Sequence, residues 1–228
     1  MKENICTIPI NDIFRETGGC PICRMHQMLE EQYVEFITGS AMMAPDVRVQ
    51  TNKTGFCHRH YSQMVKTGPR LSNALLLQTH IEEMRAKALP KKLSDAPDKK
   101  MIEAIRNLEH TCYVCDRIDA DILHLLKTVY AQYGVDEEFR KLYAGQEYIC
   151  LDHYALVMTG ASKKTVDKKY FSDFIEATNR LTATYMDSLY DSVTKFTTMY
   201  DYRSRGQDFS DCKDSIEKAV KFLTKEEV

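Results

Sequence analysis

The sequence predicts an all-α protein: a tandem duplication of a helical unit, followed by a long helix and a C-terminal helix. Three observations predict this fold class. Apolar residues recur at intervals of three and four over most of the 228 residues, as they do on one face of an amphipathic helix. No useful length of sequence alternates apolar with polar residues, as a half-buried strand would. A pattern of cysteine and histidine residues occurs twice, which indicates a repeated supersecondary unit.

Five elements are expected in the segment that carries the first copy of the cysteine–histidine pattern. Gly18-Gly19 ends the first of them, because glycine lets the backbone turn tightly. Pro69 suits the first position of a helix, since the N–H that proline lacks would be unpaired there anyway. The expected elements are a helix over 8–17, a helix after Cys23 to about Ile37, a loop or short extended piece over 41–56, a helix from Cys57 that stops at 67–68, and a helix from Pro69 to about Leu89. The helix from Pro69 is expected to bury four residues: Leu71, Leu75, Ile81 and Met84.

The second copy follows a polar, proline-flanked segment over 90–97. Its expected elements are a helix from Met101 to Leu108, a helix after Cys115 that Gly134 ends, a polar helical turn from Asp136 to Tyr143, and a helix that stops at 159–160. A long helix over about 165–200 and a last helix capped near Ser210 or Asp211 complete the chain. The long helix is expected to bury Tyr170, Phe174, Thr178, Leu181, Tyr185, Leu189, Val193 and Phe196. We therefore expect residues 1–93 to form the first repeat, 94–162 the second, and 163–228 to pack on both.

The repeated pattern is a Cys-x-x-Cys pair, a spacer of almost constant length, and a Cys-x-x-His pair. Its members are Cys20, Cys23, Cys57 and His60 in the first copy, and Cys112, Cys115, Cys150 and His153 in the second. We choose His60 rather than His58 as the ligand, because Leu151 stands at the position of His58 in the second copy. Of the eight cysteines, only Cys6 and Cys212 lie outside the pattern. We expect Cys212 to be packed and Cys6 to be a free thiol or a core residue.

Three thiolates and one imidazole in each copy suit four-coordinate Zn²⁺. The sequence thus predicts two zinc ions per chain, with an iron–sulfur cluster as the second choice because histidine ligation is rarer there. Four protein ligands close the coordination shell, so no position is open for an activated water, and we expect no catalytic residues. Closure within each repeat is the simplest pairing. The swapped arrangement, with Cys20 and Cys23 joined to Cys150 and His153, stays open.

Composition narrows the classes of function. A formal charge of −2 argues against a general binder of polyanions, which normally carries a basic surplus. No apolar stretch is long enough to span a bilayer, and the N-terminus lacks the hydrophobic core of a signal peptide. We therefore expect a cytoplasmic protein without a membrane partner. Paired cysteines stay reduced in the cytoplasm, which favours metal ligands over disulfides.

Two alternatives compete with a structural zinc protein. Cys20-Pro21-Ile22-Cys23 at a helix start has the form of a redox dithiol, but no βαβ pattern of the thioredoxin kind is visible, and Cys57 and Cys150 would be left without a role. Basic doublets such as Lys163-Lys164 are interleaved with acidic residues, which favours solvated helix faces over a nucleic-acid surface. We expect a zinc-stabilised scaffold or interaction module without catalysis of its own, which binds a protein partner or itself. The alternatives are a thiol-based redox protein or redox/metal sensor, and then a zinc-dependent nucleic-acid-binding protein.

The chain also resembles a known family. The residues that carry the resemblance are Cys-Pro-Ile-Cys at 20–23, Asn-Lys-Thr-Gly-Phe-Cys at 52–57 followed by His60-Tyr61, Ile-Pro-Ile at 8–10 and Leu-Leu-Leu-Gln-Thr-His at 75–80. Together they are similar to a family of uncharacterised bacterial proteins, mostly from anaerobic Gram-positive species, classified as a domain of unknown function. The resemblance covers most of the chain. It implies a cytoplasmic bacterial protein with cysteine-rich sites, and it implies no activity.

Overall fold

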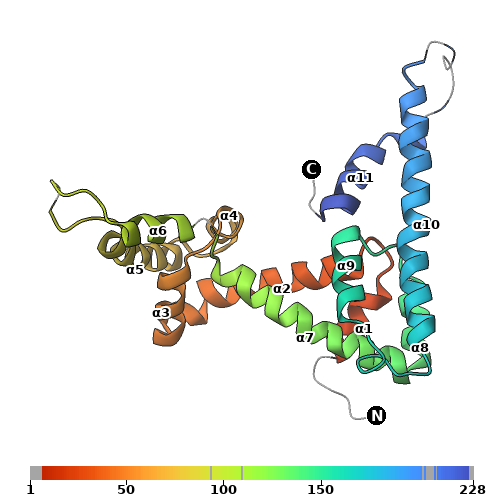
Figure 1. Cartoon of the computed structure of the whole chain (residues 1–228), viewed down its shortest axis with the longest axis horizontal. Helices are drawn as coiled ribbons and strands as arrows, with labels where there is room; N and C mark the ends of the chain where they lie inside the picture. Colours follow the sequence, from red (N-terminus) through yellow and green to blue (C-terminus); the bar gives the residue numbers. More distant parts are fainter. Residues whose placement is uncertain are drawn as a thin grey trace. The chain divides into compact units, whose positions relative to one another are not determined.

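A computed structural model describes residues 7–92, 94–108, 110–201, 203, 208 and 210–225 of the chain. Within these ranges the regular structure is helical, and none of the residues lies in a strand (Figure 1). The all-α prediction is therefore confirmed. Among the same residues, no helix is both long enough and apolar enough to cross a bilayer.

The chain forms two compact units. The terminal unit comprises Met1–Met25 and Ile122–Val228, and the central unit comprises His26–Asp121. Helices α2 (Pro21–Thr38) and α7 (Tyr113–Val135) each have residues in both units. These units follow spatial contacts, so their bounds differ from the expected segments 1–93, 94–162 and 163–228, which stay a prediction about repeats along the sequence.

The terminal unit is built from helices of the first and last parts of the chain. In addition to its parts of α2 and α7, it contains α1 (Thr7–Arg15), α8 (Glu137–Ala144), α9 (Leu151–Gly160), α10 (Phe171–Thr198), the short 3-10 helix η3 (Ser210–Cys212) and α11 (Ser215–Thr224). Helix α10 contacts α8, α9 and α11, while α1 packs on α8 (Figure 1).

An aromatic core holds the terminal unit together. Phe14 of α1 lies against Phe139 of α8 with the ring centroids 5.0 Å apart, and Tyr133 of α7 lies edge-on to Phe174 of α10 at 4.9 Å. Tyr143 contacts Phe14, Tyr133 and Phe174. All five rings are buried. This core fixes α1, which precedes Cys20, and α8, which precedes Cys150.

The last two helices of the terminal unit correct the sequence analysis in detail. Helix α10 confirms the expected long helix with narrower bounds, and it buries Phe174, Thr178, Leu181 and Leu189 as expected. Tyr185, Val193 and Phe196 were expected to be buried but are only half-buried, and Tyr170 lies before the helix as its N-cap. The last helix starts at Ser215 with Asp214 as its N-cap, so a cap near Ser210 or Asp211 was wrong. Those residues form the separate 3-10 helix η3 instead, and they place Cys212 in the interior as expected. Cys6 lies outside the described residues.

The central unit contains η1 (Ser40–Met43), α3 (Pro45–Thr54), α4 (His58–Thr67), α5 (Arg70–Ala88) and α6 (Lys99–Leu108). Residues 41–56 were expected to be a loop or extended piece, but most of them lie in η1 and α3. Pro45 at the first position, Asp46 in the first turn and Lys53 in the last turn favour this helix. Its apolar periodicity is weak because only Val47 and Thr51 are buried, so the sequence pattern missed it.

Helix α5 also corrects an expectation. Leu71 and Ile81 are exposed, although their spacing predicted that they face inward. Ser72, Asn73 and Leu76 are buried in their place. The Asn73 side chain donates to the carbonyl oxygen of Met64 at 2.8 Å, which satisfies the last turn of α4. A polar tie between helices thus sets which face of α5 lies inward.

Candidate metal centres

The eight repeated cysteine and histidine residues gather in two groups of four. The terminal site consists of Cys20, Cys23, Cys150 and His153, and the central site consists of Cys57, His60, Cys112 and Cys115. In each group one ligand atom per residue lies within 4.8 Å of all the others. Each site falls entirely within one compact unit. His58 is exposed and belongs to neither group, in agreement with the choice of His60.

Closure within each repeat was therefore wrong, and the swapped arrangement is the one observed. The physical reason is the length of the helices that follow each Cys-x-x-Cys pair. At about 1.5 Å per residue, α2 runs on for about 22 Å after Cys23, and α7 runs on for about 30 Å after Cys115. Each Cys-x-x-His pair consequently lies beside the Cys-x-x-Cys pair of the other copy.

Both sites are built from the first turns of two helices. Cys57 and Cys150 are the N-cap residues of α4 and α9. Cys20 and Cys112 occupy the same place before α2 and α7, and all four carbonyl oxygens accept the first helical hydrogen bond of their helix. The second ligand of each helix follows three residues later, on the same face of the first turn. Because free N–H groups and the positive end of the helix dipole gather there, this position favours thiolates.

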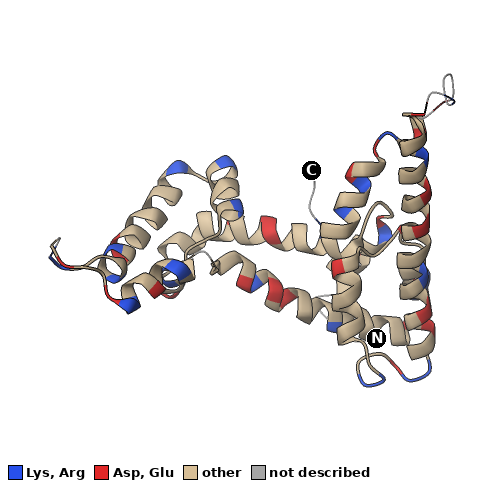
Figure 2. Ribbon diagram, turned by 45° about the horizontal axis from the view of Figure 1, so that its top comes forward, with Lys and Arg blue, Asp and Glu red and all other residues tan. Residues whose placement is uncertain are grey.

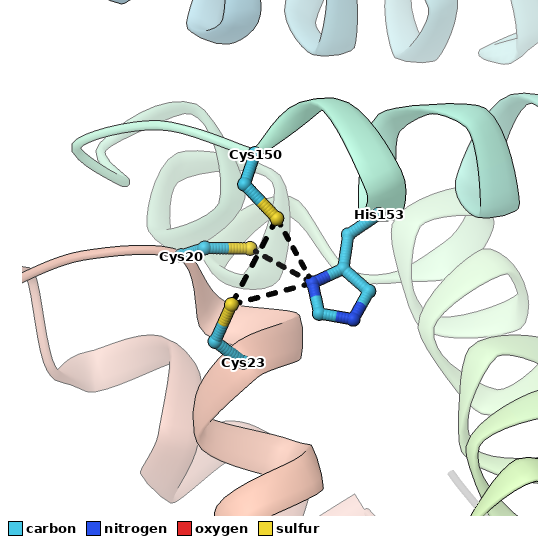
Figure 3. A group of neighbouring side chains, drawn as sticks. All are labelled: Cys20, Cys23, Cys150 and His153. Atoms are coloured by element: carbon cyan, nitrogen blue, oxygen red, sulfur yellow. Dashed lines mark hydrogen bonds between the residues drawn. The ribbon is translucent and has the colours of Figure 1, made fainter. Parts of the chain in front are cut away.

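In the terminal site the four ligand atoms converge on one point (Figure 3). The Nδ1 atom of His153 lies 3.2 Å from the sulfur of Cys150, 3.4 Å from that of Cys23 and 3.6 Å from that of Cys20. The sulfurs of Cys23 and Cys150 are 3.8 Å apart. Cys20, Cys150 and His153 are buried, while Cys23 is half-buried.

The central site has nearly the same geometry. The Nδ1 atom of His60 lies 3.2 Å from the sulfurs of Cys57 and Cys112 and 3.5 Å from that of Cys115. The sulfurs of Cys57 and Cys115 are 3.9 Å apart. His60 and Cys112 are buried, and the other two ligands are half-buried.

These separations fit a tetrahedral zinc ion. With Zn–S near ~2.3 Å and Zn–N near ~2.0 Å, a regular tetrahedron places sulfurs about 3.8 Å apart and nitrogen about 3.5 Å from sulfur. The observed sulfur–sulfur distances of 3.8 and 3.9 Å agree with this value, and they are far longer than the ~2.05 Å of a disulfide bond. The observed nitrogen–sulfur distances lie within a few tenths of an ångström of the tetrahedral nitrogen–sulfur value. The two groups of ligands are therefore suited to a metal ion.

The electrostatics of each group also favour a cation. In the central site, hydrogen bonding from Cys115 outweighs burial and lowers the pKa of Cys112 to about 3, while the same contact raises the pKa of Cys115. In the terminal site, burial raises the pKa of Cys20, but hydrogen bonds from Cys150 and Cys23 outweigh it and hold that pKa well below its ordinary value. Packed sulfurs repel one another once ionised. A divalent cation at the centre would let all three ionise together.

Comparison with known protein families assigns the chain to a family whose function is unknown. Residues 1–228 match the family described as DUF6062, a family of unknown function. The chain belongs to the DUF6062 family. The resemblance to a domain of unknown function that the sequence motifs predicted is confirmed for the whole length of the DUF6062 chain. No curated protein matches it, and neither does any solved structure.

Arg24 orders the turn that precedes the terminal site of this DUF6062 chain. Its guanidinium group donates to the carbonyl oxygens of Ile13, Glu16, Gly18 and Gly19 and to the side chain of Gln146. Gly19 has a φ of 73°, which glycine adopts without strain, and its N–H donates to Glu147 at 2.6 Å. Sequence reasoning missed Arg24, and the second copy gave no signal for it because Asp116 stands at the corresponding position.

Two hydrogen bonds join the helix starts of the central site. The carbonyl oxygen of Gly55 accepts from the N–H of Tyr113 at 3.0 Å. One residue earlier, the carbonyl oxygen of Thr54 accepts from the hydroxyl of Thr111 at 2.7 Å. The segment before Cys57 thus lies alongside the start of α7. These ties hold the Cys57 and Cys112 ligand pairs together.

Proposed function

We propose that this protein is a zinc-stabilised helical scaffold or interaction module, in which each compact unit is held by one structural Zn²⁺. The observation that carries the proposal is the convergence of three sulfurs and one imidazole nitrogen in each unit, at separations close to those of a zinc tetrahedron. The bound ion would neutralise the thiolates and pin two helix starts together. With four protein ligands per ion, the shell is closed to a reacting water.

Energetics support a structural role for the ion. Structural zinc contributes on the order of 10 kcal/mol to folding, which is comparable to the net stability of a whole domain. The central unit needs such a contribution more than the terminal unit, because its helix α6 buries no residue and α5 buries only Ser72, Asn73 and Leu76. We therefore propose that metal binding and folding are coupled in this unit.

Metal analysis of the purified full-length protein, with a count of reactive thiols before and after chelation, tests the proposal. We expect about two Zn²⁺ per chain, site thiols that react only after chelation, and a loss of helical circular dichroism when the metal is removed. A protein without metal whose cysteines form reversible disulfides would instead support the redox alternative. Unchanged circular dichroism and melting temperature after complete chelation would show that the metal has no structural role.

The distribution of charge does not favour nucleic acid as a partner. Figure 2 shows basic and acidic residues along the same helices. In α10, for example, Arg180 pairs with Glu176. A nucleic-acid surface would need basic residues gathered on one face. We therefore propose a protein partner or self-association, and a mobility-shift assay at several salt concentrations with duplex DNA and RNA should show no binding.

A further inference from the structure

Glu30 is a buried acidic residue in the middle of α2, and it contacts a ligand of the central site. Its Oε1 atom lies 3.0 Å from Nε2 of His60, the ring nitrogen that faces away from the sulfurs. Only 11% of the Glu30 side chain is exposed, and 3% of that of His60. A carboxylate is rarely buried unless it is paired, because the loss of hydration is costly. The position of Glu30 therefore requires an explanation.

Arg59 fixes the direction of this carboxylate. Its Nε atom lies 2.8 Å from Oε1 of Glu30, and its terminal nitrogen donates to Oε2 at 2.9 Å. Such a bidentate contact restrains both oxygens of the carboxylate at once. The carboxylate is thus held between the guanidinium group of Arg59 and the imidazole of His60.

We propose that Glu30 is a positioning residue for the metal ligand His60, a role that rests on the proposed function of the central site. A carboxylate beside Nε2 keeps the proton on that nitrogen, so the lone pair of Nδ1 faces the three sulfurs. It also makes the imidazole a stronger donor to a metal ion. Partners of this kind typically change metal affinity by about 10- to 100-fold.

The motif of the terminal site differs at the corresponding position. Asp152 stands between Cys150 and His153 where Arg59 stands between Cys57 and His60. The carboxylate of Asp152 accepts from Lys225 on the surface at 2.9 Å. An acidic residue there cannot clamp a carboxylate as Arg59 does. The two sites therefore have the same types of ligand but different neighbouring residues. A change at Glu30 should affect the central site alone.

The test uses the full-length protein with Glu30→Gln, and with Glu31→Gln as the matched control on the exposed face of the same helix. Loaded with ¹¹³Cd²⁺, the wild-type protein should give two resonances, and Glu30→Gln should shift only one of them. In competition with a chromophoric chelator, Glu30→Gln should weaken one of the two Zn²⁺ sites by about 10- to 100-fold. Glu31→Gln should change neither measurement.

A second variant, His60→Cys, distinguishes a residue that orients the His60 ring from one that only holds two helices together. In His60→Cys, which keeps four ligands but no imidazole, Glu30→Gln should leave the affinity for Zn²⁺ unchanged. An equal loss of affinity in this background, or none in the wild-type background, would overturn the role of Glu30. If Glu30→Gln lowers the helical content, Arg59→Gln takes its place and should weaken the same site by a smaller factor. A wild-type protein without Zn²⁺ would overturn the proposed function itself, and with it this role.

Discussion

Gly55 lies two residues before the ligand Cys57, and its backbone packs closely against the ring of His80. Its φ is 64°, in the left-handed region that glycine adopts without strain. A Cβ atom there would lie 2.9 Å from Nε2 and 3.0 Å from Cε1 of His80. The His80 ring is itself held, because its Nδ1 lies 2.9 Å from the carbonyl oxygen of Asn52.

Gly55→Ala should therefore destabilise the central unit by about 1–3 kcal/mol, since it combines a strained backbone with a displaced ring. Urea unfolding followed by circular dichroism measures this loss. Gly18→Ala is the matched control, because a Cβ atom at Gly18 meets nothing within 4 Å. A loss at Gly55 no larger than that at Gly18 would contradict the role given to Gly55.

Arg24 offers a second test at this scale. Arg24→Met removes a cation that holds several carbonyl oxygens of the turn before Cys20, and hydrogen bonds to a charged group contribute about 1.5–3 kcal/mol each. We expect a loss of about 2–4 kcal/mol and faster release of one Zn²⁺ to a chelator. Arg15→Met removes only an exposed pair with Asp12 and should cost less than about 0.5 kcal/mol. Equal losses for the two variants would refute the proposed role.

The sequence was informative about ligands and uninformative about their supports. Repeated spacing identified all eight residues that converge, because metal ligands must recur at fixed positions on a turn. Glu30 was missed because a glutamate in an amphipathic helix normally faces solvent. It lies four residues before Val34 and seven before Ile37, both buried, and this helical spacing could have placed it on the inner face.

At the scale of the element, one device is used four times: a cysteine immediately before a helix and a second ligand in the first turn. The sequence predicted most of the described helices because their apolar residues recur regularly on one face. It was less reliable where polar contacts decide the orientation, as in α5, and where a helix buries few apolar residues, as in α3. Periodicity reports the burial of apolar side chains, so it carries little information about such helices.

The corrected orientation of α5 can be measured. Leu76 is 2% exposed and Leu71 is 68% exposed, although the spacing predicted that Leu71 faces inward. Leu76→Ala should cost about 2–4 kcal/mol of stability through lost burial and the cavity that remains. Leu71→Ala, in the same helix, should stay within about 0.5 kcal/mol of the wild type. Denaturant unfolding of both variants checks the pair, and the reverse order would restore the orientation expected from the sequence.

At the scale of the whole molecule, the exchange of ligand pairs between the two copies of the cysteine–histidine pattern decides which parts of the chain each ion would hold. The terminal site joins Cys20 and Cys23, near the start of the chain, to Cys150 and His153 in its second half. It thereby closes a loop that contains the whole central unit. Spacing along the sequence cannot reveal this pairing, because both arrangements use the same residues. The lengths of α2 and α7 were the available signal.

Counting bound zinc in paired variants distinguishes the two arrangements. Cys20→Ser and Cys150→Ser both weaken the terminal site, so after dialysis against a chelator the double variant should keep the central ion, as each single variant does. Combining Cys20→Ser with Cys57→Ser weakens both sites, so this protein should keep neither ion. Closure within each repeat would give the opposite result for the two double variants. Cys212→Ser, at a buried cysteine outside both sites, is the control and should keep both ions in native mass spectrometry.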